Sequence, residues 1–308
     1  MKKNVYIILL VIYSSATLGN HTPTLQKIKS FFSGKMLEKT EQKEIATEDI
    51  NTLAITNIHG SITVKSGPTK SLCLKTIIRA KKQDDIDATT VAFHGIKNGT
   101  FSVSTEQKNS KNRALVEYEL IVPATLNVDL TILGSGTVSV KDIHGTIDVI
   151  ANDTVSIANT RKLVCAQTLK KGGITISNAY GPVETQSTHG TIIGENIAQS
   201  FYARSEKGKI NIAYKKVPST SSIDLKSISG NITLGLPHNT NAELRSYTEH
   251  GTLVSDLYIL IKPFTTQLNS QAWKKFKQAI DGSIGSGEAT IALHSCKGNI
   301  RITEVKTT

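Results

Sequence analysis

The fold is decided between residues 173 and 254, where one short unit recurs: Gly173-Ile-Thr-Ile176, Gly190-Thr-Ile-Ile193, Gly208-Lys-Ile-Asn-Ile212, Gly230-Asn-Ile-Thr-Leu234 and Gly251-Thr-Leu-Val254. In most of these units, apolar residues two positions apart predict a strand with one buried face. The glycine before each strand suits a turn position that needs a positive φ. The β-branched residues Ile, Val and Thr favour the same extended conformation.

The spacing of these units predicts how the strands are arranged. Successive glycines from Gly173 to Gly251 are 17, 18, 22 and 21 residues apart. A second strand, such as Ser222–Leu225 or Ala242–Arg245, fits between two glycine turns. A rung of roughly 20 residues with two or more short strands is the repeat of a β-solenoid. An antiparallel sandwich also has closely spaced short strands, but the near-constant phase of the turns favours the solenoid.

The same unit recurs outside this stretch and defines the domain. It is found at Gly60-Ser-Ile-Thr-Val64 and Gly136-Thr-Val-Ser-Val140, and again at Gly298-Asn-Ile-Arg-Ile302. We therefore expect an all-β chain with one β-strand-repeat domain over residues 50–308. Residues 134–308 form its regular solenoid part. Residues 50–133 are spaced less regularly and form either a cap or a sandwich-like region, since solenoid ends need protection.

Residues 270–281 interrupt the repeat and predict a short helix. Ser270 can cap its first turn and Gly282 can end it. The apolar face of this helix either packs on the flank of the solenoid or contacts a membrane or a ligand. The residues expected to make such a contact are Trp273, Lys274, Lys275 and Lys277.

The first 19 residues have the layout of a secretory signal peptide. Lys2 and Lys3 precede an apolar run over residues 5–13, and small residues follow at 14–19. The run is about half the roughly 20 residues that a spanning helix needs. We therefore expect cleavage, and a mature protein outside the cytoplasm, in the periplasm or at the cell surface.

Residues 20–49 read as a basic leader that is partly helical or disordered. The chain of 308 residues has 36 Lys and Arg against 25 Asp and Glu, a net charge of +11, and part of this excess lies here. Phe31 and Phe32 lie among these lysines, so the leader either rests on a membrane or polyanion or is solvated. We expect no nucleic-acid partner, because no recognition motif accompanies the charge.

Two stretches carry a family resemblance. Tyr118-Glu-Leu-Ile-Val-Pro123 is followed by a glycine unit, and Gly230-Asn-Ile-Thr-Leu-Gly-Leu-Pro237 precedes another. With the late Gly298 unit, this order resembles the bacterial "putative adhesin" family of β-strand-repeat domains, related to head domains of auto-transporter adhesins. The resemblance covers residue 50 to the C-terminus. It implies an exported β-solenoid with an adhesin-like role and brings no catalytic residues.

The search for catalytic residues finds none. Glycan-cleaving enzymes need a pair of carboxyl groups, but Asp129, Asp148 and Asp224 are single in the sequence. The sequence contains no nucleophile elbow, zinc-protease motif or P-loop. We expect no enzyme and no cofactor.

The histidine and cysteine residues do not predict a functional site either. Five histidines directly precede a glycine, and if their turns stacked they could line up to bind a transition metal; the simpler interpretation is an exposed polar turn, so we expect no metal site. The cysteines lie in alternating segments, which predicts buried thiols in strands. The residues concerned are His59, His94, His144, His189, His250, Cys73, Cys165 and Cys296.

Hydroxyl side chains beside the buried positions point to a binding surface. They would lie on the solvent side of a flat sheet and suit extended contacts with glycans or proteins, although Thr is also an ordinary exposed strand residue. We expect an exported, non-enzymatic, adhesin-like binding module whose partner is a glycan or an envelope or surface protein. The alternatives are a periplasmic structural or envelope-stress accessory protein and a glycan-processing enzyme. The hydroxyl residues are Thr63, Ser139, Thr175, Thr191 and Thr233.

Overall fold

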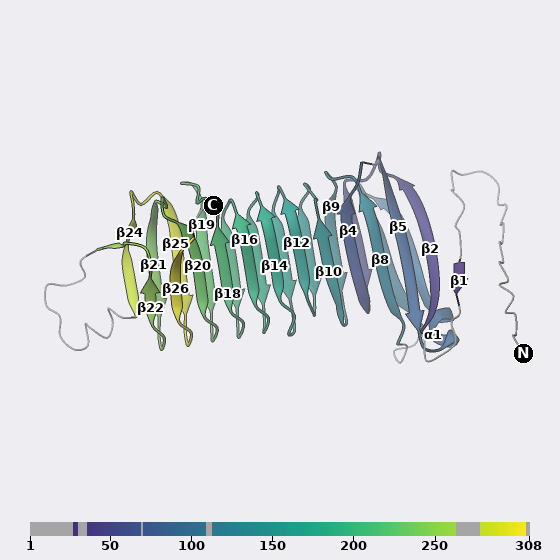
Figure 1. The fold of residues 1–308 in the computed structure, drawn as a ribbon. Helices are drawn as coiled ribbons and strands as arrows, with labels where there is room; N and C mark the ends of the chain where they lie inside the picture. Colours follow the sequence, from purple (N-terminus) through teal and green to yellow (C-terminus); the bar gives the residue numbers. More distant parts are fainter. Residues whose placement is uncertain (1–26, 30–35, 69, 109–112, 263–277, 306–308) are drawn as a thin grey trace, which may run out of the picture.

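The computed structural model describes residues 27–29, 36–68, 70–108, 113–262 and 278–305. Within these residues the chain forms two long β-sheets of 13 strands each, called sheet A and sheet B here. The strands lie side by side along one axis, with β2 near one end and β24 at the other (Figure 1). The all-β solenoid expected from the glycine units is confirmed.

Sheet A contains, in spatial order, β1 (Lys27–Lys29), β2 (Leu37–Ala46), β5 (Ser71–Ala80), β8 (Leu115–Val122), β4 (Gly60–Ser66), β10 (Gly136–Lys141), β12 (Val155–Thr160), β14 (Ile174–Ala179), β16 (Ile192–Ile197), β18 (Ile210–Tyr214), β20 (Ile232–Pro237), β26 (Ile300–Val305) and β22 (Leu253–Ser255).

Sheet B contains, in spatial order, β23 (Leu260–Ile261), β24 (Ala279–Ile284), β21 (Ala242–Thr248), β25 (Ala289–Ser295), β19 (Ser222–Ser227), β17 (Phe201–Ser205), β15 (Val183–Ser187), β13 (Val164–Thr168), β11 (Ile147–Ala151), β9 (Asn127–Ile132), β3 (Thr52–Asn57), β7 (Thr100–Gln107) and β6 (Thr89–Lys97). A five-residue helix, α1 (Gln83–Asp87), follows β5.

Each rung consists of one sheet B strand followed in sequence by one sheet A strand, and ten such rungs stack in parallel within the described residues. From β9–β10 to β19–β20 the spatial order follows the sequence. At each end one rung is out of order. The β3–β4 rung lies between β7–β8 and β9–β10, and the C-terminal β25–β26 rung lies between β19–β20 and β21–β22.

The core is built from ladders of equivalent residues. In sheet A, Ile174, Ile192, Ile210, Ile232 and Ile300 pair in register, and each is almost fully buried. Because every rung places the same kind of side chain at the same height, the hydrophobic contacts continue along the axis. This continuity is the main stabilising term in a stack of thin rungs.

Glycines line the edge at which sheet B strands turn into sheet A strands, called the glycine edge here. An ideal Cβ at Gly208 would lie 1.8 Å from the carbonyl oxygen of Gly190, and one at Gly230 would lie 1.8 Å from that of Gly208. The expectation of positive φ is wrong for these residues: among the unit glycines named above it holds for Gly60. Close approach of successive backbones, rather than turn conformation, requires glycine along this edge.

A hydroxyl three residues before the glycine completes each of the last five turns. The Oγ of Ser227 accepts a hydrogen bond from the backbone N–H of Gly230 at 2.8 Å. It also donates a hydrogen bond to the carbonyl oxygen of Gly208, in the preceding rung, at 3.4 Å. The hydroxyl therefore satisfies buried backbone groups that the turn would leave without partners. The motif is Ser/Thr-x-x-Gly and occurs at Ser187, Ser205, Ser227, Ser295 and Thr248.

A ladder of amides lines the opposite edge, where sheet A strands turn into sheet B strands. Asn159, Asn178 and Asn196 all have positive φ, as does Asp142. Each amide donates to the side-chain oxygen of the preceding rung, at 2.6 Å, 2.8 Å and 2.5 Å. Asparagine fits because it tolerates the left-handed conformation and supplies both a donor and an acceptor. We call this side the asparagine edge.

Antiparallel strands close both ends of the solenoid. At one end β5 pairs with β8 and β2 with β5; at the other end β24 pairs with β21. The less regular part at residues 50–133 thus contributes a cap as well as rungs. No helix among the described residues is long and apolar enough to cross a membrane.

Two expected segments differ from the structure. Residues 37–46, expected to belong to a leader, form β2, because this segment pairs antiparallel along the whole length of β5. Residues 279–281, expected to end a helix, begin β24, which pairs with β21. Tertiary pairing with a free sheet edge outweighs the local pattern in both cases. Residues 270–277 of that helix lie outside the described residues, as does the signal peptide.

Gly208→Ala should destabilise the solenoid, because the added methyl group would overlap the Gly190 carbonyl. We expect a loss of about 1–3 kcal/mol in the free energy of unfolding, measured by urea denaturation. Lys207→Ala, in the same turn and exposed, is the matched control. Equal stability of the two variants would contradict the steric account of the glycine edge.

Asn178→Ala should also destabilise the chain, because it removes two ladder hydrogen bonds and places alanine at φ 53°. The expected loss is about 1–2 kcal/mol. Asn178→Gly relieves the backbone strain but restores no hydrogen bond, so it should recover only part of the loss. Full recovery with glycine would show that the amide ladder contributes nothing.

Candidate functional site

The outer face of sheet A carries the hydroxyl row expected from the sequence. Thr63, Ser139, Thr175 and Thr233 lie at the same position of successive strands, with Ser156 between Ser139 and Thr175. Ile193 and Asn211 interrupt the row before Thr233. Thr191 does not belong to it, since it lies in the turn before β16.

The outer face of sheet B is more highly charged than this hydroxyl row. One row of in-register residues contains four carboxylates, a thiol and a tyrosine; the neighbouring row, two residues further along each strand, contains amides and two cations. The first row is Asp129, Asp148, Cys165, Glu184, Tyr202 and Asp224, and the second is Thr131, Ile150, Gln167, Gln186, Arg204 and Lys226. We call these two rows the sheet B tract.

The acids that are single in the sequence are therefore neighbours in space. Asp148 pairs in register with Asp129 on β9, and Glu184 follows two strands away. The sequence interpretation of these acids as dispersed is wrong for the sheet B tract. A separation of 19 residues equals one rung here, so residues far apart in the sequence stack directly.

This stacking changes the acidity of the tract. Burial, and then the negative charge of Asp148, raise the pKa of the Asp129 carboxyl. Burial, and then the charges of Glu184 and Asp148, raise the pKa of the Cys165 thiol. The acidic row therefore disfavours further negative charge and favours donors of hydrogen bonds and cationic groups.

A shallow depression lies along the tract from β11 to β19. Carboxylates line it on one side and amides on the other, with the ring of Tyr202 between Glu184 and Asp224. Tyr202 is 39% exposed, so its ring is accessible from solvent. The lining residues are Asp148, Ile150, Cys165, Ala166, Gln167, Glu184, Thr185, Gln186, Tyr202, Ala203, Arg204 and Asp224.

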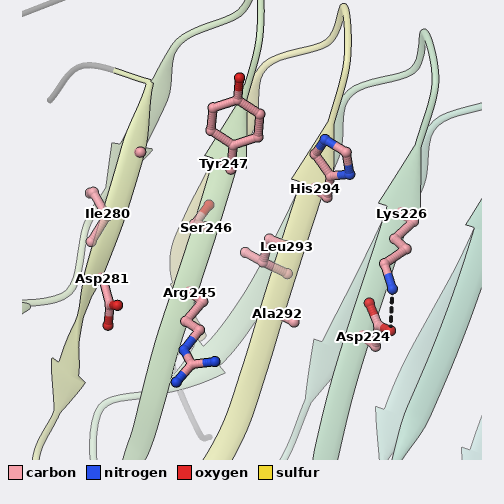
Figure 2. Close-up of a pocket in the computed structure, with 11 residues that line it drawn as sticks. Asp224, Lys226, Arg245, Ser246, Tyr247, Ile280, Asp281, Ala292, Leu293 and His294 are labelled. Carbon is pink, nitrogen blue, oxygen red and sulfur yellow. Dashed lines mark hydrogen bonds and ion pairs between the residues drawn. The ribbon is translucent and has the colours of Figure 1, made fainter. Parts of the chain in front are cut away.

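A second hollow continues the tract toward the C-terminal end of the solenoid (Figure 2). Its floor is low because Ala292 lies in register between Asp224 and Arg245. Asp224 accepts a hydrogen bond from Lys226 at 2.7 Å, while its other carboxylate oxygen is buried without a hydrogen-bond partner. Tyr247 stacks on His294 at the upper rim, with ring centroids 5.5 Å apart.

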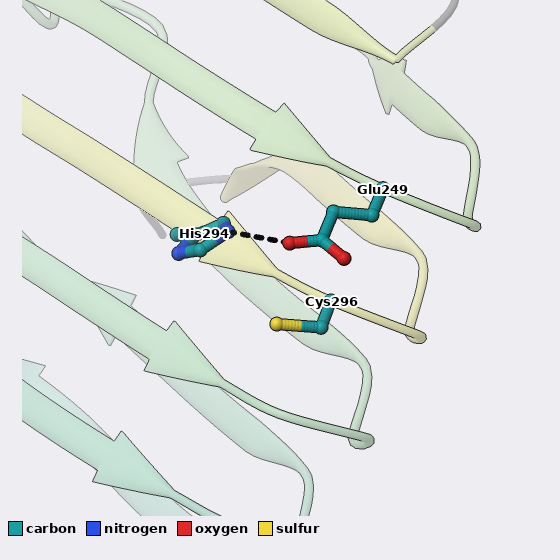
Figure 3. Close-up of side chains that lie close together, drawn as sticks. All are labelled: Glu249, His294 and Cys296. Atoms are coloured by element: carbon teal, nitrogen blue, oxygen red, sulfur yellow. Dashed lines mark ion pairs between the residues drawn. The ribbon is translucent and has the colours of Figure 1, made fainter.

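A mixed cluster of possible metal ligands lies beside this hollow (Figure 3). One donor atom each from Glu249, His294 and Cys296 lies within 4.8 Å of the others. The Nε2 atom of His294 is buried, has no hydrogen-bond partner, and lies 4.0 Å from the Glu249 carboxylate. Burial, then the charge of Glu249 and a hydrogen bond to it, raise the pKa of the Cys296 thiol.

The sequence interpretation missed this cluster, although a signal was present. Glu249 and Cys296 both hold the second position of a Ser/Thr-x-x-Gly turn, in Thr248–Gly251 and Ser295–Gly298. Aligning the turns on their glycines would place the two residues in one column. Only the tertiary structure shows that their rungs are adjacent.

The histidines of the glycine turns do not form a column. The His189 and His250 turns are separated by those at Gly208, Gly230 and Gly298, and His144 lies on the opposite edge, between β10 and β11. Of the prediction of buried thiols in strands, the strand placement is confirmed for Cys73 in β5 and Cys165 in β13. The burial is wrong, because Cys73, Cys165 and Cys296 are only partly buried.

The residues expected to contact a partner or membrane lie outside the described residues. These are Phe31, Phe32, Trp273, Lys274, Lys275 and Lys277. Their roles stay predictions.

Comparison with known proteins identifies no family by sequence. No family model matches the chain, and no curated protein matches it. The chain is similar to solved structures described as a "putative adhesin" from Bacteroides fragilis NCTC 9343 and a "putative lipid binding protein" from Parabacteroides distasonis ATCC 8503.

The first similarity has 16% identity and a TM-score of 0.47, over 86% of this chain and 97% of that one. The second has 12% identity and a TM-score of 0.41, over 87% and 97%. A "putative cell adhesion protein" from Clostridium sporogenes ATCC 15579 has 12% identity and a TM-score of 0.26, over 87% and 100%. With TM-scores below 0.5, these similarities carry no argument about function. The adhesin-family resemblance and its auto-transporter relation stay predictions.

Asp148→Asn should lower the pKa of Asp129 toward its ordinary value, because it removes the neighbouring charge. The folded-state pKa lies above the unfolded one, so Asp129 costs stability once the pH rises above its ordinary pKa. The variant should therefore be more stable at pH 7 and show a weaker loss of stability between acid and neutral pH. NMR titration of the carboxyl groups and urea unfolding at several pH values measure both effects.

Asp84→Asn, at an exposed position of helix α1, is the control and should leave Asp129 unchanged. If Asp129 titrates identically in the Asp148→Asn variant, the two carboxyl groups do not interact as the row implies.

Proposed function

We propose that this chain is an exported, non-enzymatic binding module that holds an extended glycan of the cell envelope or surface along the sheet B tract. The observation that carries the proposal is the depression from β11 to β19, where carboxylates and amides recur in register beside the exposed ring of Tyr202. This role is adhesin-like in the sense that the chain binds and does not transform its ligand.

The chemistry of the tract suits a polyhydroxylated chain. Glu184 and Asp224 accept hydrogen bonds from hydroxyl groups, while Gln186 can both donate and accept. Tyr202 offers the apolar face of its ring, which can pack on the C–H groups of a sugar. Successive rungs repeat about every 4.8 Å, so equivalent groups recur along a ligand that lies parallel to the solenoid axis.

The geometry of the acids favours binding over hydrolysis. Asp129 and Asp148 lie one rung apart, the kind of carboxyl pair that glycan hydrolysis uses. However, Asp129 does not line the depression, which is shallow and open along the sheet. Catalytic sites commonly enclose the reacting groups and exclude water. An open surface of this kind suits retention of a long ligand.

The proposal of export rests on residues 1–19. Their charged start, apolar run and small residues have the order of a cleaved signal peptide. N-terminal sequencing of the mature protein, cell fractionation and protease treatment of intact cells test this part. Cleavage with surface exposure supports an adhesin-like role, whereas a cleaved but protected protein favours the periplasmic accessory role.

Glu184→Gln and Tyr202→Ala test the tract directly. Weaker hydrogen bonding to the Glu184 side chain costs about 1.5–3 kcal/mol, so Glu184→Gln should lower glycan affinity by about ten-fold or more. Tyr202→Ala removes the ring face that packs on the sugar and should also lower the affinity. The measurement is binding of the mature protein to immobilised envelope and host glycans, with affinities from titration of the best binder.

Glu195→Gln and Tyr180→Ala are the matched controls. Glu195 lies on the outer face of sheet A and Tyr180 at the asparagine edge, and both are exposed. They should bind as the unaltered chain does. The proposal fails if no glycan binds, if the control variants lose as much affinity as the tract variants, or if bound glycan is cleaved.

A further inference from the structure

We propose that Glu249, His294 and Cys296 form a binding site for one divalent transition metal ion, with Zn²⁺ the best match, at the glycine edge near the C-terminal end of the solenoid (Figure 3). The site is separate from the glycan-binding depression over β11–β19 and does not depend on it. None of its residues lines that depression.

The donor set is the first argument. A thiol, an imidazole and a carboxylate are the three side chains that bind Zn²⁺ in proteins, and a thiolate favours this class of ion over Mg²⁺ or Ca²⁺. Donors around one tetrahedral zinc, at about 2.0–2.3 Å from the ion, lie within about 4 Å of one another. The three donor atoms here lie within 4.8 Å, so small side-chain rotations bring them to one ion.

The state of His294 is the second argument. Its Nε2 atom is buried, has no hydrogen-bond partner, and faces the Glu249 carboxylate at 4.0 Å. A buried polar atom without a partner costs free energy, and an ion between the two groups would satisfy it. Tyr247 stacks on the imidazole ring and limits its rotation, so the ring is held before an ion arrives.

The backbone is the third argument, because it positions two of the three ligands rigidly. The N–H of Glu249 donates to the carbonyl of Ser295 at 3.2 Å, and the N–H of His250 donates to that of Cys296 at 3.0 Å. The two turns are therefore stacked by main-chain hydrogen bonds. Ligands fixed on a rigid edge lose little entropy when they bind an ion.

The three ligands come from two rungs that only tertiary structure makes neighbours. His294 and Cys296 belong to the C-terminal rung β25–β26, and Glu249 follows β21 in the rung outside it. A bound ion would therefore link the inserted C-terminal rung to its outer neighbour. Three protein ligands also leave a fourth position for water or a ligand group.

The test is titration of the mature, reduced, chelator-treated protein with Zn²⁺ and with Co²⁺. We expect one equivalent of Zn²⁺ by calorimetry, a rise in the melting temperature, and a cobalt complex with the charge-transfer absorption of a thiolate ligand. Cys296→Ser and His294→Gln should each lower the affinity by about 100-fold or more, beyond the usual effect of an outer-shell change. Cys296→Ser should also abolish the thiolate band.

Two variants away from the site are the controls. Glu206→Gln changes the same turn position as Glu249, but three rungs further along, where Thr188 and Ile228 are its column neighbours. Cys165→Ser changes a partly buried thiol in the sheet B tract. Both should bind Zn²⁺ as the unaltered chain does, and circular dichroism should show that all variants are folded.

A measurement on the unaltered chain guards against variants that fail to fold. One equivalent of Zn²⁺ should protect Cys296 from alkylation by iodoacetamide, while Cys73 and Cys165 react at unchanged rates, as read by peptide mass spectrometry. The proposal is overturned if no stoichiometric binding occurs, if the cobalt complex lacks the thiolate band, or if zinc protects all three cysteines equally.

Discussion

The close approach of successive backbones at the glycine edge is the constraint on which the rest of the structure depends. Parallel, in-register strands bring each turn directly onto the turn of the next rung, with the Gly190 carbonyl where a Cβ of Gly208 would be. The Ser and Thr hydroxyls of the same turns then satisfy the backbone groups that this approach buries. On the other edge, the amide ladder from Asp142 to Asn196 meets the same need with side chains.

The register of the strands determines which side chains become neighbours on the outer faces of the two sheets. Once Asp148 lies over Asp129 and Glu184 lies two strands further on, carboxylates separated by a rung of sequence form one acidic row. A parallel stack can offer a ligand carboxylates at several successive rungs, which single sites on compact domains do not. The price is repulsion within the row, visible in the raised pKa of Asp129. An extended ligand that donates hydrogen bonds would relieve this repulsion.

The order in which the rungs stack differs between the ends of the solenoid and its middle. Rungs β9–β10 to β19–β20 stack in sequence order, but the C-terminal rung inserts between β19–β20 and β21–β22. Inserting the C-terminal strands places them inside the sheets and leaves β22 and the antiparallel β23 and β24 to close the end. The insertion also brings Cys296 to Glu249, so this cluster of possible metal ligands lies where the chain order is broken.

The sequence by itself determined the solenoid, because glycine spacing and two-residue alternation are local and repeat in nearly every rung. It also predicted the row through Thr63, Ser139, Thr175 and Thr233, since equivalent positions of one unit must share a face. It could not reveal the order of the end rungs, because Gly251 and Gly298 have equivalent turns and either could follow Gly230. Nor could it show that residues 37–46 and 279–284 add antiparallel strands, because that depends on which sheet edges are free. The acidic row lies on rungs that stack in sequence order, but the structure was needed to show which residues of the sheet B strands are in register. The Glu249–His294–Cys296 cluster was decided by tertiary structure alone, since it depends on which end rung lies beside which.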